Sequence, residues 1–345
     1  MIRRKDVAER AGTSPAVVSY VLNGGSRPVA PQTRERVLKA VAELNYRPNR
    51  IARSLRMNKT MTLGLVSPDS ANPFFAELSN DIEDAAFNAG YTVLIGNSAE
   101  DLQRQAKHID AFIDHQVDGL LLVPAEGTTE EHLRQLPKST PAVILDRVLP
   151  DVDLPKVVVN NAAGAAIATK HLFDHGRTRI ACIAGPRYSM PSEERVQGFL
   201  EAARAAGMNG AVSELVRHVP FGRRSGYLAA SKLLREEPVD SFFVTSDEQA
   251  AGVLRAIVEV GLKCPEDVAV VSFDGIRSSA YTVPTLTSMA QPFSEIGAAA
   301  LEVLLKLING SAVDSVTELE VRLTQRRSCG CPDPDPGDLL DPELS

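Results

Sequence analysis

The chain has 345 residues, enough for about two domains of ~150 residues with room for a small third. Its proportions of hydrophobic residues (44%) and charged residues (23%) are those of an ordinary globular protein, which excludes disorder over the whole chain. No apolar stretch approaches the ~18 residues that span a bilayer, and residues 1–6 lead into an amphipathic pattern rather than a secretory signal. We therefore expect no contact with a membrane. The cysteines are too few and too scattered for a disulfide framework, which favours a reducing cytoplasm; they are Cys182, Cys264, Cys329 and Cys331.

The net charge of −7 conceals a division along the chain. Residues 1–60 contain 13 Lys and Arg and 4 Asp and Glu, a net charge of +9. The remaining residues contain 24 basic and 40 acidic side chains, a net charge of −16. A small basic head before an acidic body indicates that the head binds a polyanion and the body does not.

Apolar spacing predicts three short helices within residues 1–46. Gly12 ends the first, Ser14 and Pro15 supply an N-cap and a first helical residue for the second, and the third begins after residues 28–31. Two short helices joined by a glycine-containing turn and braced by a third form a helix-turn-helix, whose second helix enters the major groove of DNA. The residues expected in its core are Val7, Ala8, Ala11, Val17, Val18, Val21, Leu22, Val37, Leu38, Val41 and Leu44.

Three segments of this head, residues 6–12, 18–23 and 43–49, resemble the DNA-binding head of the lac repressor family. The resemblance continues through residues 52–55 and extends over nearly the whole chain. It implies that Pro15, Ala16 and Tyr20 read the bases. The first two are apolar and can contact thymine methyl groups, so Tyr20 is expected to carry much of the direct readout. The alternative is that Tyr20 packs on the third helix. The expected phosphate contacts are Ser19, Asn23, Thr33 and Arg34.

Residues 47–60 form a predicted link between head and body. Asn49 is a good N-cap for the basic residues 50–56, which are too few for a stable helix alone and are expected to fold on DNA. The resemblance implies a hinge helix that inserts Leu55 into the minor groove, where an apolar wedge bends the duplex. The alternative is that Leu55 belongs to the core of the next domain.

From residue 61 to 328, apolar runs alternate with helical patterns, which predicts an α/β body with doubly wound parallel sheets in two lobes. The expected strands are Leu63–Val66, Tyr91–Ile95, Leu120–Val123, Ala142–Leu145, Val157–Val159, Ile180–Ala184, Phe242–Val244 and Val268–Phe273. The expected helices cover about 73–89, 100–115, 160–175, 193–206, 222–236, 247–260 and 293–309.

Polar residues follow several of these strands, at the edge where open α/β sheets bind ligands. One of them, Asp247, is equally explained as a helix N-cap. The body resembles the periplasmic sugar-binding fold of the lac repressor family, and within it the ribose-binding type. That resemblance implies a sugar site of aromatic rings with alternating carboxylate, guanidinium and amide groups. The implied residues are Asn72, Phe74, Phe75, Asp146, Arg147, Arg195, Phe221, Ser246, Asp274 and Gln291.

Two positions bear on the identity of the ligand. Ser246 stands where the ribose-binding pattern has Asn, which leaves room for a bulkier ligand or a water. Arg147 stands where the purine-responsive branch has an aromatic residue, which favours a small sugar, such as a pentose, over a purine.

Residues 329–345 are expected to be a disordered acidic tail. No leucine heptad follows residue 325, so we expect a homodimer and a near-palindromic operator. Cys329 and Cys331 have no nearby histidine in sequence and fall short of a four-ligand zinc site, so no metal and no cofactor are expected. The sequence lacks Gly-x-Gly-x-x-Gly, phosphate-loop, Gly-x-Ser-x-Gly and His-Glu-x-x-His motifs, which argues against an enzyme.

The combined interpretation is a homodimeric, sugar-responsive transcriptional regulator, most simply a repressor. Alternatives within the family are a response to a nucleoside, a hexose or a phosphorylated sugar, and a ligand that acts as corepressor. Alternatives outside it are an enzyme that uses the strand-end acids, which turnover would reveal, and a sugar sensor that acts through a protein partner.

Overall fold

The computed structural model describes residues 2–23, 28–46, 59–134, 136–137, 139–149, 152–208 and 211–333. The chain divides into two compact units, Met1–Thr60 and Met61–Ser345. The predicted hinge contacts of Asn49 and Leu55 lie outside the described residues. None of the helices in the described part of the chain has the length and apolar character needed to cross a membrane.

The head consists of three helices, α1 (Arg4–Arg10), α2 (Pro15–Asn23) and α3 (Pro31–Glu43), as the sequence predicts. The Ser14 hydroxyl accepts a hydrogen bond from the Val17 amide, which caps α2. Val7, Val18 and Val37 are fully buried at the centre of this small core. The prediction that Leu38 is buried is wrong, because its side chain is 46% exposed on the outer face of α3.

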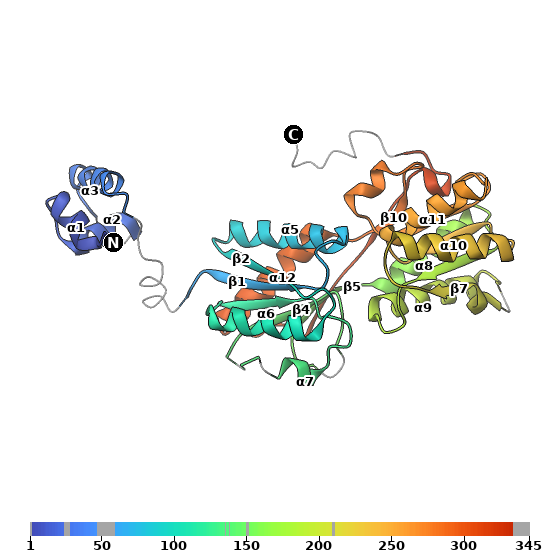
Figure 1. Ribbon diagram of the computed structural model, residues 1–345, viewed down its shortest axis with the longest axis horizontal. Coiled ribbons are helices and arrows are strands. Elements are labelled where there is room, and N and C mark those ends of the chain that lie inside the picture. The colour runs from blue at the N-terminus through green and yellow to red at the C-terminus, as the bar shows by residue number, and fades with distance from the viewer. Residues whose placement is uncertain are drawn as a thin grey trace. The chain divides into compact units, whose positions relative to one another are not determined.

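The body contains two six-stranded sheets, each covered by helices on both faces (Figure 1). The first sheet has the order β11-β5-β4-β3-β1-β2, and all its described pairings are parallel. Its strands are β1 (Thr62–Ser67), β2 (Thr92–Asn97), β3 (Gly119–Leu122), β4 (Ala142–Leu145), β5 (Lys156–Val159) and β11 (Val316–Leu319). Its helices are α5 (Pro73–Asn88), α6 (Leu102–Asp114), α7 (Glu130–Leu133) and α12 (Phe293–Ile308).

The second sheet has the order β12-β10-β9-β8-β6-β7, and only the β10–β12 pairing is antiparallel. Its strands are β6 (Ile180–Ala184), β7 (Val216–His218), β8 (Ser241–Val244), β9 (Ala269–Asp274), β10 (Thr287–Ala290) and β12 (Arg322–Thr324). Its helices are α8 (Asn161–Asp174), α9 (Met190–Ala205), α10 (Arg223–Glu236) and α11 (Asp247–Glu259), with the 3₁₀ turns η1 (Ala211–Leu215), η2 (Arg277–Tyr281) and η3 (Arg327–Cys329).

The chain passes between the two lobes three times, after β5, after β10 and after β11. The first lobe therefore takes α12 and β11 from the C-terminal part of the chain, and the second lobe takes β12. Parallel strands point their carboxyl ends toward one edge in each lobe, which is where a ligand of this fold class binds.

All eight predicted strands are present, but sequence patterns missed β7, β10, β11 and β12. These strands have three or four residues, and β10 (Thr-Ser-Met-Ala) is largely polar although its first three residues are buried. Its hydroxyl groups have internal partners, since Ser288 donates to Asp247 and Thr287 donates to the Arg326 carbonyl. Buried polar residues with such partners leave no hydrophobic run to detect.

The expected disordered tail does not begin at residue 329. Cys329 is 1% exposed, and Asp333 pairs with Arg327 and Thr285. The fold also brings His171 of α8 and His175 at its C-cap to Cys329 and Cys331, so these thiols have histidine neighbours in space that their sequence surroundings do not indicate. Roughly 155 residues separate the two pairs, and the sequence alone carries no signal of their contact.

Candidate functional site

A pocket of about 360 Å³ lies at the strand ends between the two lobes of the body. Nine of the ten predicted ligand residues line the pocket; the tenth, Gln291, lies behind it and donates to Asp274. The residues that line it are Asn72, Phe74, Phe75, Asp146, Arg147, Ser189, Pro191, Arg195, Phe221, Ser246 and Asp274.

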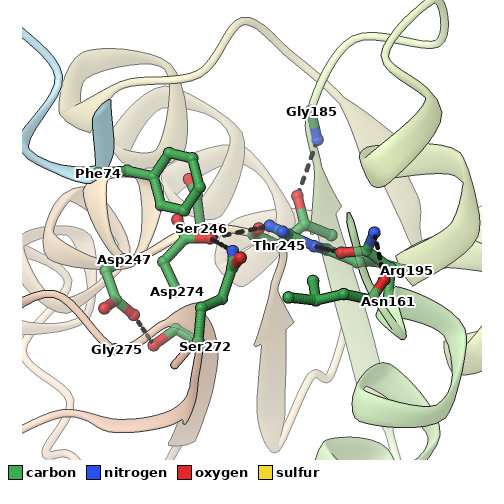
Figure 2. Close-up of polar contacts among 12 residues, drawn as sticks. Phe74, Asn161, Gly185, Arg195, Thr245, Ser246, Asp247, Ser272, Asp274 and Gly275 are labelled. Carbon is green, nitrogen blue, oxygen red and sulfur yellow. Dashed lines mark hydrogen bonds and ion pairs between the residues drawn. The ribbon is translucent and has the colours of Figure 1, made fainter. Parts of the chain in front are cut away.

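Arg195 is the centre of the polar network on the second lobe (Figure 2). Its guanidinium donates to Asn161 Oδ1 at 2.8 Å and to the Thr245 carbonyl at 2.6 Å, and it pairs with Asp274 Oδ1 at 3.0 Å. It also lies over the Phe273 ring at 3.8 Å from the ring centroid. Helix α9 supplies this side chain and strand β9 ends at its partner Asp274, so the network joins a helix to the sheet edge.

Arg147 plays the corresponding part on the first lobe. It forms a two-pronged pair with Glu100, at 3.0 and 2.7 Å, and donates to the Pro124 carbonyl at 2.8 Å. A bidentate pair fixes the plane of the guanidinium. Asp146, which precedes it after β4, has a φ of +63°. This left-handed conformation turns the Asp146 carboxyl into the pocket that Arg147 also lines.

Aromatic rings form the apolar wall. Phe74 and Phe75 meet edge to face with centroids 4.9 Å apart, and Arg147 lies 5.7 Å from the centroid of Phe75. Asn72 caps α5 by accepting from the Phe74 amide at 3.1 Å, which sets the direction of both phenylalanines. Phe221 closes the other side against Gly185, where any Cβ would overlap its ring.

Burial dominates the electrostatics of the pocket. It raises the pKa of Asp274 to about 7, with Arg195 opposing the shift and Asp247 and Asp146 adding to it. Burial also raises the pKa of Asp146, although Arg147 and Arg195 act in the opposite direction. Two carboxyl and two guanidinium groups thus face one small volume, where they can both accept from and donate to the hydroxyl groups of a polyol.

Ser246 lies at the pocket, whereas Asp247 does not have the N-cap role suggested by sequence. Ser246 is the N-cap of α11, and its hydroxyl accepts from the Gln249 amide while also lining the pocket. Asp247 is therefore not the cap. It is 2% exposed and accepts from the Ser272, Ser279 and Ser288 hydroxyls and from the Ile276 amide, which makes it a structural carboxylate behind the site.

Sequence reasoning missed Ser189, Pro191 and Asn161. The first two line the pocket from the start of α9, and Asn161 orients Arg195 while its amide nitrogen donates to Glu194. Ser189 and Pro191 lie several residues beyond the end of a predicted strand, where the strand-end rule does not reach. Asn161 comes two residues after the predicted strand Val157–Val159, so the rule could have selected it.

The head places its predicted base-reading residues at the start and middle of α2. Pro15 and Ala16 are exposed, and Tyr20 is 36% exposed, so it does not pack into the head's core. Arg34 is exposed on α3, while Ser19 and Thr33 are half-buried. Asn23 is the last residue of α2.

A helix-turn-helix head followed by a two-lobed body with a polar pocket between its lobes defines a class of DNA-binding regulators with a periplasmic-binding-type body. A model of the bacterial regulatory proteins of the lacI family matches residues 5–49, and a model of the periplasmic binding protein-like domain matches residues 169–329.

Curated relatives and solved structures agree with these matches. The chain is 36% identical to the HTH-type transcriptional repressor PurR of Aliivibrio salmonicida, over 88% of this chain and 91% of that protein. It is also 36% identical to the ribose operon repressor of Halalkalibacterium halodurans, over 93% of this chain and 96% of that protein. The crystal structure of the lac repressor dimer bound to operator and the anti-inducer ONPF superimposes with a TM-score of 0.85 at 27% identity, covering 95% of this chain and 99% of that one. The chain belongs to the lac repressor family: it is a DNA-binding transcriptional repressor and not an enzyme.

Proposed function

We propose that this repressor responds to a small sugar, with a pentose such as D-ribose as the first candidate, which binds between the lobes of its body. The observation that carries the proposal is that Asp274, held by Arg195 and Gln291, lines the same pocket as Phe74 and Phe75. Among the described residues, both contacts to the Asp274 carboxylate reach Oδ1, so Oδ2 is the oxygen that can accept from a ligand hydroxyl. Aromatic rings suit the apolar face of a sugar, while the charged groups suit its edge.

The small volume and the four charged side chains favour a polyol over a larger flat base. The ribose operon repressor and PurR are equally similar relatives, so identity does not separate the two ligand classes. Arg147 favours a sugar over a purine as the ligand. Its bidentate pair with Glu100 presents a cationic edge at this position rather than a surface on which a base could stack.

Calorimetric titration of the full-length chain with D-ribose tests the proposal. We expect saturable binding that R195A weakens by more than about 10-fold, because the substitution leaves Asp274 buried without its cation. The matched control is R217A, at a half-exposed arginine on β7 that does not line the pocket. Binding of a purine base or nucleoside, with no response to ribose, would reject the pentose and favour the corepressor alternative.

We further propose that the repressor acts as a homodimer on a near-palindromic operator in the cytoplasm, with α2 of each head in the major groove. Thermodynamic linkage requires that an inducing sugar bind the DNA-free state better, by the same factor by which DNA affinity falls. A gel-shift titration with and without the ligand shows whether the ligand lowers or raises the affinity for DNA. Tighter DNA binding with ligand would replace the inducer model with a corepressor model.

A further inference from the structure

Four side chains that commonly bind transition metals converge on the second lobe, away from the effector pocket. They are His171 of α8, His175 at the C-cap of that helix, and Cys329 and Cys331 of the segment after β12. Cys329 contacts Thr287, the first residue of β10, whereas Gln291 of the pocket network follows the last residue of that strand. The cluster therefore lies at the opposite edge of the sheet from the candidate sugar site.

The ligand atoms have the spacing of a tetrahedral site. His171 Nε2 lies 3.2 Å from Cys329 Sγ and 3.9 Å from Cys331 Sγ, and His175 Nε2 lies 3.4 Å from Cys331 Sγ. All four atoms lie within 4.8 Å of one another. A tetrahedral zinc ion with Zn–S of about 2.3 Å and Zn–N of about 2.05 Å holds its nitrogen and sulfur ligands about 3.5 Å apart. The observed distances bracket that value.

The local structure explains how each pair reaches this arrangement. His171 lies in the last turn of α8 and His175 is its C-cap residue, four positions later, so their rings lie on one face, with centroids 4.5 Å apart. Gly330 has a φ of +102°, a left-handed conformation that reverses the chain and lets two cysteines separated by one residue face the same histidines. Ser328 anchors the turn by donating to the Val270 carbonyl and accepting from the Thr287 amide.

The surroundings of the four side chains provide both a contact that orients a ligand and a route by which an ion can enter. Cys329 is buried, and its sulfur lies 3.1 Å from the Thr287 hydroxyl oxygen, an outer contact of the kind that orients a ligand. Cys331 is half-buried and His175 is exposed, so an ion can enter from that side.

We propose that His171, His175, Cys329 and Cys331 bind one zinc ion in a closed structural site that ties the segment after β12 to α8. Two imidazoles and two thiolates form a donor set that zinc prefers, and four protein ligands leave no position for a reacting water. Each thiol that is protonated beforehand releases its proton to solvent when the ion binds.

Zinc content of the full-length chain tests this site. The protein is purified under reducing conditions from zinc-supplemented culture, passed over a chelating resin and measured by elemental mass spectrometry. We expect about one zinc ion per chain. Loss of an outer-shell partner alone costs about 10- to 100-fold in metal affinity, so loss of a direct ligand in H175N or C331S should cost at least as much. His175 is exposed, so H175N tests the site without disturbing the core.

Matched controls are H115N, at an exposed histidine that follows α6, and C182A, at a buried cysteine on β6 outside the cluster. Both should retain the ion. A cobalt-substituted chain should show the visible d–d bands of a tetrahedral ion together with thiolate charge transfer, and H175N should lose them. The proposal is overturned if the wild-type chain carries no zinc, if the controls lose zinc as readily as H175N, or if mass spectrometry finds a Cys329–Cys331 disulfide in the reduced, zinc-exposed protein.

Discussion

Three buried carboxyl groups lie at or behind the pocket between the lobes, and each has a different role. Asp247 is surrounded by four donors and stabilises the structure behind the pocket. Asp146 faces the pocket beside Arg147, and Asp274 shares one oxygen between Arg195 and Gln291. Burial of Asp274 outweighs its single cationic partner and brings its pKa to about 7, so its protonation changes with pH near neutrality.

The raised pKa of Asp274 predicts a pH dependence of stability. The pKa is about 7 in the folded chain, against about 3.9 in an unfolded one, so between these values the folded state binds the extra proton. Stability of the ligand-free protein should therefore fall as pH rises from about 4 to about 7, by at most about 1.4 kcal/mol per pH unit from this group. Urea unfolding across that range should show a flatter profile for D274N than for the wild type. D314N, at an exposed position on the first lobe, should match the wild type; identical profiles for D274N and wild type would contradict the assignment.

At the scale of elements, glycines allow two pairs of helices to pack backbone against backbone. A Cβ at Gly252 of α11 would overlap the Arg223 carbonyl of α10 and come within 2.6 Å of the Tyr227 amide nitrogen. Gly226 of α10 faces the Gln249 carbonyl of α11 in the same way, and Gly198 of α9 faces Ala162 of α8. These contacts fix how closely the helices behind the pocket approach.

G252A should therefore destabilise the body. Helix propensity alone would make Ala in place of Gly more stable by about 1 kcal/mol. Overpacking of a tight contact costs about 1–3 kcal/mol and more where backbone must move, so the contact should outweigh the propensity. Denaturant unfolding measures whether the free energy of unfolding of G252A falls or rises relative to the wild type. A variant as stable as the wild type would show that α10 and α11 can separate without cost.

The recognition helix α2 yields a prediction for DNA binding. Tyr20 is exposed beside two apolar residues, so Y20A should remove about 1–3 kcal/mol of discrimination between operator and unrelated duplex. Non-specific affinity should change little, because it depends on the phosphate contacts. Fluorescence anisotropy with both duplexes measures the two affinities. Equal losses on both would show that Tyr20 supports the fold of the head or a phosphate contact instead.

The fold and the pocket were largely predictable because their signals are local. Each long apolar run became a strand, and the residues at the ends of strands met at one pocket, as the parallel arrangement requires. Leu38 was misplaced because helical spacing does not reveal where the apolar face ends. The strand β11, with half-exposed residues at the edge of the first sheet, has no run to detect.

The features that could not be predicted from the sequence depend on packing between distant segments of the chain. Asn161 matters through Arg195, 34 residues away, and the histidine–cysteine cluster depends on a contact across 158 residues. Such pairs follow from the order in which strands join a sheet, and no periodicity of the chain records that order.

At the scale of the whole molecule, the basic side chains are concentrated in the DNA-binding head and the acidic side chains in the body. The +9 of residues 1–60 and the −16 of the remainder give the two units opposite tendencies toward DNA. An acidic body discourages contact with the polyanion except through the head.

Removal of residues 1–60 should therefore separate the two activities. The chain Met61–Ser345, one of the two compact units, should lose detectable binding to DNA and keep the sugar affinity of the full chain within about 2–3-fold, the level at which independent units usually remain additive. Gel shift and calorimetry on the same preparations measure both quantities. Loss of sugar binding on removal of the head would contradict the independence of the two units.

The three passages of the chain between the lobes have a consequence for synthesis. On the ribosome, the head is complete after about 50 residues, but the first lobe awaits α12 and β11, and the second awaits β12 and η3. A chain that stops before residue 291 lacks the helix that covers one face of β3 and β4, so its first sheet stays partly bare. Truncated products would carry a complete DNA-binding head but an incomplete ligand-binding body. Their exposed sheets would make them substrates for chaperones and proteases before they could occupy an operator without regulation.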